Sequence, residues 1–548
     1  MAASSRYQEI AETLGRHGLG FLATAVGVSH WARIAKGSSA PPLLNPARTV
    51  PERLRLVLEE LGPTFVKLGQ LLSTRPDLLP PDYISELSKL QDDAPPVASE
   101  AIIEAIRAEL GADPNQIFTE FDEHPLASAS IGQAHRAVLV DGTEVVVKVR
   151  RPDAVRKVNE DLEILQNLAD RASRIWEPAR TYNLHGLVQE FALTIRGELD
   201  YLREAQNAER FAANFAGRTD VSIPRVFRET TTSRVLTLER VSGIRINDVA
   251  ALDAADVDRP ALARTGAKIM LRMIFEDGFF HADPHPGNLF VQADGSITLI
   301  DFGMVGDLDP DLQDRFVDFL IAFTRRQPDQ LADALIDLSV TAGTGDIDRL
   351  RENLASFVAD YSDKPLSEVS FAHLASELLA IVRQQRLQLP REVALIFKVL
   401  IMMEGIGVQL DPDYDLMGVL TPYVRRLLRE RLSFSAMSRR LIRASADTGA
   451  LMIEMPTRLR RLLDRADRSG IEVHLRASEL EPLVGRTERI GNRLVAGLIA
   501  AALINGVGSL VANEKRWRSW EGALLGAGLT AVSSLTGYLL WTSRRRHR

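Results

Sequence analysis

Cysteine is absent from all 548 residues of the sequence. This absence excludes disulfide bonds, zinc sites built from thiolates, and cysteine nucleophiles. Aromatic residues make up only 6% of the chain, but 45% of the residues are hydrophobic and 25% are charged, which is the composition of an ordinary folded protein. The length suffices for two or three domains.

An excess of positive charge is also missing. The formal net charge is -7 and the pI is near 5.9, so the chain has no global attraction for nucleic acid, and we expect no nucleic-acid partner. An apolar run at 18–28 follows a segment with equal numbers of acidic and basic residues, and no small-residue cleavage site comes after it. We therefore expect no cleaved signal peptide.

Two long stretches near the C-terminus contain no charged residue. Residues 494–512 form a run of 19 and residues 523–542 a run of 20, and each is close to the roughly 20 residues that cross a bilayer. We predict a transmembrane helical hairpin at 491–548; the alternative is a pair of buried helices in a soluble domain. Seven arginines flank the outer ends and three basic residues lie in the connecting loop, which predicts a cytoplasmic location for both ends.

The segment HADPHPGN at 281–288, followed by Asp301-Phe302-Gly303, carries the most chemistry. Asp283 and Asn288 are five residues apart, and Asp301 lies thirteen beyond Asn288. Kinase catalytic loops of the form HRDxxxxN followed by DFG share this arrangement. In them one carboxylate orients the acceptor hydroxyl or water, while an amide and a second carboxylate hold magnesium against the phosphates. We predict that Asp283 is catalytic and that Asn288 and Asp301 bind Mg²⁺.

The order of predicted elements indicates an α+β protein with a two-lobed protein-kinase-like fold, with nucleotide between the lobes. An Asp-Gly turn at 294–295 between two short apolar strands predicts a hairpin that presents both motifs at one end. The predicted parts are an N-terminal helical extension at 1–115, an N-lobe at 116–240, a C-lobe at 241–432, a basic helical linker at 433–490 and the membrane hairpin at 491–548.

Lys148 lies inside the apolar run 143–149 and is the candidate for a lysine that contacts nucleotide phosphates from a strand. Its predicted partner is Glu204, because a buried ammonium needs an anion to hold its position. The alternatives are a strand-end lysine that reaches solvent and an acidic surface helix around Glu204.

Small residues occupy the place where a kinase has its glycine-rich loop. They allow backbone amides to approach phosphates, and Ser128 or Ser130 adds a hydroxyl. Fewer glycines restrict positive-φ conformations, so nucleotide binding should differ from that of a protein kinase. The predicted nucleotide-binding residues are Ala127, Ser128, Ala129, Ser130, Ile131, Gly132 and Lys148, with Glu239 and Val241 at the end of the predicted strand 235–238.

Six motifs, in order, resemble those of the UbiB family of atypical kinases, also called the AarF or ADCK family. They are Lys67-x-Gly69-Gln70, the alanine-serine loop, Val147-Lys148, Glu198-x-Asp200, the segment 281–288 and Asp301-Phe302-Gly303. The resemblance covers about residues 60–410, and the C-terminal hairpin also resembles that of bacterial UbiB proteins. The loop departs from the family form AAASIAQVH at Ser128, Gly132 and Ala134.

The resemblance implies a kinase-like fold in which the KxGQ segment packs across the active site, with Lys67 meeting Glu198. Gln70 and Asp200 are the other regulatory candidates. It also implies that the protein binds ATP or ADP with Mg²⁺, hydrolyses ATP, and supports the biosynthesis of ubiquinone or another prenyl lipid at a bacterial inner membrane or its equivalent. The implied partners are a membrane lipid or prenyl-lipid intermediate and lipid-biosynthesis enzymes.

Three other functions fit parts of the sequence. His281-x-Asp283-x-His285 has the spacing of a hydrolase metal site, although that site gives no role to Asn288, Lys148 or Asp301. In a kinase the two histidines would instead fix the loop by hydrogen bonds. A pseudokinase-like scaffold would use nucleotide only to organise a lipid-biosynthesis complex. A true protein kinase is the third possibility, but no Ala-Pro-Glu closes an activation segment after Asp301.

Overall fold

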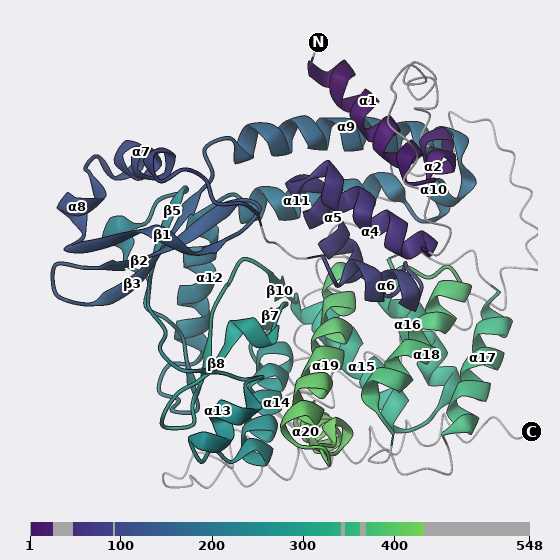
Figure 1. Ribbon diagram of the computed structural model, residues 1–548. Coiled ribbons are helices and arrows are strands. Elements are labelled where there is room, and N and C mark those ends of the chain that lie inside the picture. The colour runs from purple at the N-terminus through teal and green to yellow at the C-terminus, as the bar shows by residue number, and fades with distance from the viewer. Residues whose placement is uncertain (1, 26–47, 91–93, 341–345, 362–368, 432–548) are drawn as a thin grey trace, which may run out of the picture. The chain divides into compact units, whose positions relative to one another are not determined.

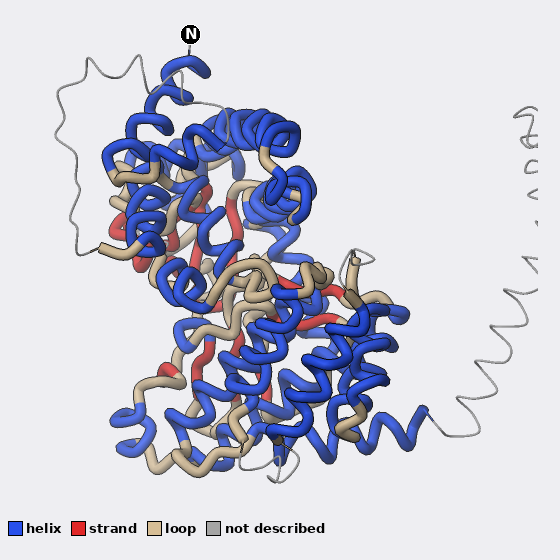
Figure 2. The backbone as a smooth tube through the Cα atoms, turned by 90° about the vertical axis from the view of Figure 1, so that its right-hand side faces the viewer, coloured by secondary structure: helices blue, strands red, loops and turns tan. Residues whose placement is uncertain are grey.

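The computed structural model describes residues 2–25, 48–90, 94–340, 346–361 and 369–431, all within one compact unit (Figure 1). Helices, drawn in blue in Figure 2, make up most of this described chain. The predicted basic linker at 433–490 and the predicted membrane hairpin at 491–548 lie outside the described residues.

The N-terminal extension is helical, as the sequence predicts. Its helices are α1 (Ala2–Arg16), α2 (Gly20–Ala25), α4 (Val50–Leu61), α5 (Pro63–Ser73), α6 (Pro81–Leu87) and α7 (Ser99–Leu110). Thr49 and Glu52 form a capping box that starts α4, and Gly62, with a φ of 95°, turns the chain into α5. α4 and α5 share an apolar core with α9 (Ala154–Ile175) and α11 (Leu184–Glu198), so α5 is held against α11.

An antiparallel sheet in the order β1-β2-β3-β5 forms the N-lobe. Its strands are β1 (Glu120–Ser128), β2 (Gly132–Val138), β3 (Glu144–Arg150) and β5 (Val235–Glu239), and the short helix α8 (Pro114–Ile117) precedes them. Val145, Val147 and Val149 of β3 are fully buried in a core shared with α7. Because strand side chains alternate in direction, Lys148 projects from the opposite face, toward α12 (Tyr201–Asn214).

The predicted catalytic hairpin is confirmed. It consists of β8 (Leu289–Val291) and β9 (Ile297–Leu299), with Gly295 at a φ of 81° in the turn. The hairpin lies in a sheet of order β4-β9-β8-β6, where β4 is Val221–Ser222 and β6 is Ile244–Arg245. Just before it, β7 (Phe279–His281) pairs with β10 (Val305–Asp307). At the open end of the hairpin Ile300 N donates to Asn288 O at 3.0 Å, so both motifs start from the same end.

Helices build the rest of the C-lobe. They are α13 (Val249–Ala254), α14 (Arg259–Phe275), α15 (Pro310–Thr324), α16 (Pro328–Leu338), α17 (Ile347–Asp360), α18 (Phe371–Gln384), α19 (Arg391–Leu410) and α20 (Leu416–Arg431). Among the described helices, α19 alone is long and apolar enough to cross a membrane, but 67% of its apolar stretch is buried inside the protein. Its apolar residues belong to the main core, so α19 is a core helix of this lobe.

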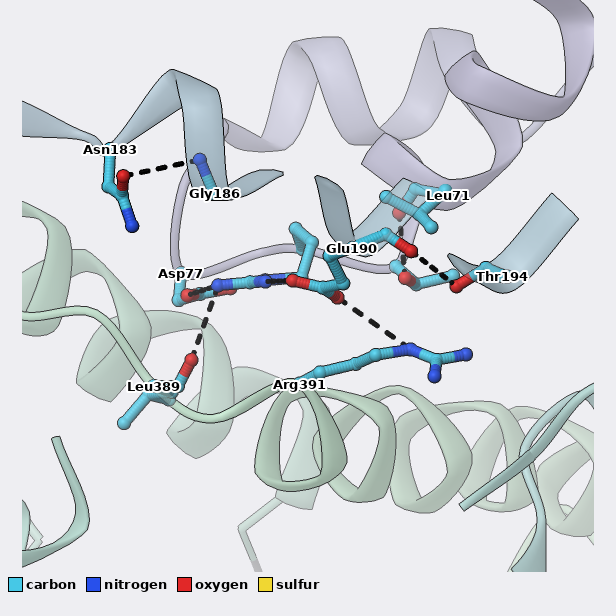
Figure 3. Close-up of polar contacts among 10 residues, drawn as sticks. Leu71, Asp77, Asn183, Gly186, Glu190, Thr194, Leu389 and Arg391 are labelled. Atoms are coloured by element: carbon cyan, nitrogen blue, oxygen red, sulfur yellow. Dashed lines mark hydrogen bonds and ion pairs between the residues drawn. The ribbon is translucent and has the colours of Figure 1, made fainter. Parts of the chain in front are cut away.

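An ionic cluster of Arg75, Asp77, Glu190 and Arg391, in which Arg75 and Asp77 are buried, ties the extension to the C-lobe. Figure 3 labels Asp77, Glu190 and Arg391 of this cluster. Arg75 Nη2 donates to Asp77 Oδ2 at 2.8 Å and to the Leu389 carbonyl at 3.2 Å, and its Nη1 lies 3.1 Å from Glu190 Oε2. Arg391 Nε lies 3.6 Å from Glu190 Oε1. The segment after α5, helix α11 and the start of α19 therefore meet at one point.

Candidate active site

Lys148 lies between two carboxylates. Its Nζ is 2.5 Å from Glu204 Oε1 and 3.5 Å from Asp301 Oδ1. Lys148 comes from β3, Glu204 from the first turn of α12, and Asp301 from the chain that follows β9. The Glu204 side chain is 8% exposed, and the ammonium offsets the cost of burying it. The structure thus brings together the predicted pair and one of the predicted magnesium ligands.

The charges of these three groups set their protonation. Burial opposes the charge of Lys148, but the carboxylates of Asp301 and Glu204 outweigh burial and raise its pKa. The Lys148 ammonium, against the effect of burial and with help from Lys67, lowers the pKa of Asp301 to about 2. Burial raises the pKa of Glu204, and Lys148 opposes that change. At neutral pH Lys148 is therefore cationic and Asp301 is anionic, which are the states that phosphate and magnesium binding require.

The backbone of Asp301 is strained. Its φ of 63° lies in the left-handed region, which residues with side chains adopt rarely. Such a conformation persists where the surroundings fix it. The next residue, Phe302, is fully buried with its ring centroid 5.4 Å from that of Phe211 and 5.8 Å from that of His281. Asn207 Nδ2 also donates to the Phe302 carbonyl at 2.9 Å, so packing on one side of the turn holds Asp301 in the site.

Hydrogen bonds fix the loop that carries Asp283. His281 is fully buried, its Nδ1 accepts from Asp283 N at 3.2 Å, and its Nε2 lies 3.1 Å from the Ile300 carbonyl. Burial lowers the pKa of His281, so the ring is neutral and Nε2 is the atom that donates to that carbonyl. His285 Nδ1 accepts from Gly287 N at 3.2 Å. Both histidines therefore bond to the backbone of the site, as the kinase interpretation predicts.

The donor set fits magnesium held together with phosphates. Asn288 Nδ2 donates to the Asp283 carbonyl at 3.1 Å, so the amide oxygen is the Asn288 atom that can bind a cation. That oxygen and the Asp301 carboxylate match the one or two protein ligands that magnesium commonly takes in phosphate sites. The hydrolase alternative lacks its ligands: both His281 nitrogens face backbone atoms, and no three His, Asp or Glu side chains form a metal cluster in the described chain.

Lys398, which the sequence motifs do not predict, lies beside Asp283. Its Nζ is 2.8 Å from Asp283 Oδ1, and its side chain is 19% exposed. Lys398 comes from α19, where no other charged residue occurs between Glu392 and Glu404. An isolated lysine in an apolar helix needs a polar partner, so this pattern in the sequence could have identified Lys398 as a site residue.

The KxGQ segment on α5 lies against the same site. Lys67 Nζ is 3.0 Å from Glu198 Oε2 at the end of α11, the pairing that the family resemblance implies. Gln70 Nε2 donates to the Leu90 carbonyl at 3.1 Å. A Cβ on Gly69 would lie 2.3 Å from Leu90 Cδ1, so glycine at this position allows the close packing of α5. Lys67 and Gln70 are thus held at the site by a helix that packs closely against its neighbours.

These groups line one cavity of about 690 Å³. The predicted site residues in its wall are Lys67, Gln70, Ala127, Ala129, Ile131, Gly132, Lys148, Glu198, Glu204, Asp283, Asn288 and Asp301. The predicted site residues outside this lining are Ser128, Ser130, Asp200, Glu239 and Val241.

Local hydrogen bonds account for several of these outlying positions. Ser128 still belongs to β1, and its Oγ accepts from Arg151 Nη2 at 2.9 Å. Asp200 caps α12, where its Oδ1 accepts from the amide of the second helical residue at 3.1 Å. Glu239 Oε2 accepts from Arg225 N at 3.2 Å. Because β1 ends at Ser128 and β2 begins at Gly132, the turn between them contains only residues 129–131 and is shorter than the predicted loop.

Comparison with known proteins adds independent evidence. The family model for the ABC1 atypical kinase-like domain matches residues 89–335, and that for the UbiB helical domain matches residues 354–415. A probable protein kinase UbiB of Xanthomonas campestris pv. campestris is 35% identical over 92% of this chain and 93% of its own length. The Arabidopsis thaliana protein ACTIVITY OF BC1 COMPLEX KINASE 7, chloroplastic, is 33% identical over 91% and 73%, and an uncharacterized Synechocystis protein is 34% identical over 90% and 84%. The chain therefore belongs to the UbiB family of ABC1 atypical kinase-like proteins.

Proposed function

We propose that the protein is a membrane-anchored atypical kinase or ATPase that binds Mg-ATP or Mg-ADP and supports the biosynthesis of ubiquinone or another isoprenoid lipid. The observation that carries the enzymatic part is the convergence of Lys148, Asp283, Asn288 and Asp301 on one cavity. Its volume of about 690 Å³ is in the range of small-molecule sites. The uncharged segments 494–512 and 523–542 support the membrane anchor, and the family resemblance supports the lipid pathway.

Each residue has a role that its position permits. Lys148, held by Glu204, donates hydrogen bonds to phosphate oxygens. Asn288 and Asp301 supply oxygen ligands for Mg²⁺, which when bound neutralises the charge of the phosphates. Asp283 accepts a hydrogen bond from the attacking water or hydroxyl and orients it toward the phosphate. The chain thus contributes positioning and electrostatic stabilisation, which are what phosphoryl transfer needs from a protein.

The N-terminal extension favours water or a small acceptor over a protein substrate. Lys67, Gln70 and Glu198 form part of the cavity wall. The Lys67–Glu198 pair is largely buried, with side chains 16% and 12% exposed. A peptide would have to displace this wall before it reached Asp283. ATP hydrolysis, or transfer to a lipid-like phenol that enters from the membrane side, is therefore our preferred reaction.

The replacement Asp301→Asn tests the assignment. It preserves the size of the side chain but removes the charge that faces Lys148 and binds magnesium, so we expect Mg-dependent turnover to fall about 100-fold or more. The measurement is phosphate release from Mg-ATP by the detergent-solubilised protein, with and without a phenol that resembles a quinone precursor. Asp307→Asn is the control, because Asp307 is 60% exposed and pairs with Arg210 on the surface.

Unchanged turnover in Asp301→Asn would contradict the proposed site. A wild-type protein that binds Mg-nucleotide but neither releases phosphate nor transfers it would support the nucleotide-dependent scaffold. Rapid phosphorylation of a separate protein would support a true protein kinase.

A further inference from the structure

Helix α19 holds Lys398 at the cavity in a fixed register. Glu404, 8% exposed, accepts hydrogen bonds from Phe371 N at 2.6 Å, Ala372 N at 2.7 Å and Ser370 Oγ at 2.9 Å. The Glu404 carboxylate thereby accepts hydrogen bonds from backbone amides in the first turn of α18, which have no acceptor within the helix. At the other end of α19, Arg391 joins the ionic cluster. The helix is therefore fixed on both sides of Lys398.

One face of α19 forms part of the cavity wall. Lys398 and Met402 are both in the lining, and residues four apart lie on the same face of a helix. The rest of this stretch is buried in the main core. An ammonium has three N–H groups, and the contact with Asp283 Oδ1 at 2.8 Å accounts for one of them. Lys398 can therefore bridge Asp283 and a second anion in the cavity.

The position of Lys398 differs from those of the three other lysines that line the cavity. Lys89, which is 57% exposed, pairs with Glu86. Lys67 pairs with Glu198, and Lys148 pairs with Glu204 beside the magnesium ligand Asp301. Lys398 pairs with Asp283, the residue that orients the attacking oxygen under the proposed function. A cation beside the attacking oxygen is also beside the phosphoryl group that this oxygen attacks, because the two atoms must meet in the reaction.

We propose that Lys398 is a further catalytic residue, which donates one N–H to Asp283 and another to the terminal phosphoryl group of ATP during transfer. This inference rests on the proposed function. In the step, the bond from the terminal phosphorus to the bridging oxygen of ADP breaks, and its electron pair stays on that oxygen. The bond from phosphorus to the acceptor oxygen forms, the acceptor proton leaves with the phosphate product or to solvent, and Lys398 keeps its own proton.

This role also changes what Asp283 can do. The contact with Lys398 Nζ holds Asp283 Oδ1 at 2.8 Å, so the carboxylate orients the attacking oxygen from a fixed position. Charge accumulates on the transferred phosphoryl oxygens in the transition state, and a prepositioned ammonium stabilises it. Lys398 therefore affects the terminal phosphate of ATP and has little effect on ADP.

Nucleotide binding tests this inference without requiring turnover. The variants are Lys398→Met and Lys398→Gln, with Lys268→Met as the control because Lys268 is an exposed lysine on α14. We expect the affinity for Mg-ADP to stay within about threefold of wild type, and that for a non-hydrolysable Mg-ATP analogue to fall about tenfold, as for loss of a charge-assisted hydrogen bond. Isothermal titration calorimetry on the detergent-solubilised full-length protein measures both.

Turnover provides the second readout. We expect kcat for phosphate release to fall about 100-fold in Lys398→Met and KM for Mg-ATP to rise by up to about tenfold, in step with the weaker binding of the ATP analogue. Lys398→Arg should recover at least part of both losses, because it restores the cation. Lys398→Gln keeps a polar side chain and serves if Lys398→Met does not fold. The proposal is overturned if the variants weaken ADP and the ATP analogue equally, or if kcat is unchanged. A wild-type protein that binds neither nucleotide would instead overturn the proposed function, and this inference with it.

Discussion

Asp301 combines three properties in one residue. It balances Lys148, it offers oxygen atoms to a cation, and its backbone is held at a φ of 63° by the packing of Phe302. Residues in strained conformations cluster at functional sites, because the surroundings must be built to hold them. Four other described residues with side chains also have a positive φ, and none of them lines the cavity, so the backbone of Asp301 supports the site only together with its contacts.

The low pKa of Asp301 predicts a pH dependence of stability. Lys148 lowers this pKa from 3.8 to about 2 in the folded protein, so folding favours the ionised carboxylate. The stabilisation is fully present above about pH 4 and is lost as the pH falls toward 2. We expect the difference in Tm between wild type and Asp301→Asn to be constant from about pH 8 to 5 and to shrink below about pH 4. Thermal unfolding followed by circular dichroism measures the two Tm values at each pH. A Tm difference that stays constant down to about pH 2.5 would contradict the prediction.

Local spacing explains why part of the site could be predicted. Asp283, Asn288 and Asp301 lie within nineteen residues on one hairpin, so the sequence alone places them together. Lys398 is 115 residues from Asp283, and only the packing of α19 brings the two together. The roles of these residues stay predictions, whereas the kinase-like α+β fold and the family are confirmed by the structure and the comparisons.

At the scale of elements, alternation and close packing decide which side chains reach the cavity. The buried valines of β3 fix the direction of Lys148, which a period of two predicts from the sequence. Gly132 departs from the family form, and a contact with a distant part of the chain explains this glycine. A Cβ there would lie 2.1 Å from Tyr201 Oη on α12, so glycine makes room for this hydroxyl. A single sequence cannot show that contact.

The close packing of α5 predicts the effect of Gly69→Ala. The new Cβ would lie 2.3 Å from Leu90 Cδ1 and 2.8 Å from Leu58 Cδ1, so α5 must shift or these side chains must move. We expect a loss of about 1–3 kcal/mol in the free energy of unfolding. Chemical denaturation measures it.

Gly405→Ala is the matched control for this change. Gly405 is also inside a helix, but a Cβ there would meet nothing within 4 Å. We expect a gain of up to about 1 kcal/mol, from the better helix propensity of alanine. Equal effects of the two substitutions would show that packing around α5 is not the cause.

At the scale of the whole described unit, the ionic cluster is the point where three distant segments meet. Arg75 comes from the extension. Glu190 from α11 and Arg391 from α19 are labelled in Figure 3. The same helices α11 and α19 carry Glu198 and Lys398 to the cavity. The cluster therefore supports the extension and both of these site residues together.

Burial of the cluster predicts a large effect of Arg75→Met. The side chains of Arg75 and Asp77 are 4% and 0% exposed, and removal of the guanidinium leaves a buried carboxylate without its partner. We expect the free energy of unfolding to fall by about 3–5 kcal/mol. Chemical denaturation followed by circular dichroism measures the loss.

Arg218→Met is a close control. Arg218 and Asp220 have the same sequence spacing, and Arg218 Nε donates to Asp220 Oδ1 at 2.8 Å, but their side chains are 34% and 35% exposed. A surface pair contributes about 0–1 kcal/mol, so we expect only a small loss. Similar losses for the two arginines would mean that burial does not determine the strength of the cluster.

The ionic cluster also sets the order in which a newly made chain can complete its site. Arg75 and the Leu389 carbonyl are 314 residues apart, and synthesis at about 5–20 residues per second separates them by roughly 15–60 s on the ribosome. During that interval Arg75 lacks its bond to the Leu389 carbonyl. Leu389 and Lys398 then emerge within a few residues of each other, so the support for the extension and the cation beside Asp283 arrive together. A chain that stops before α18 carries the nucleotide motifs without either.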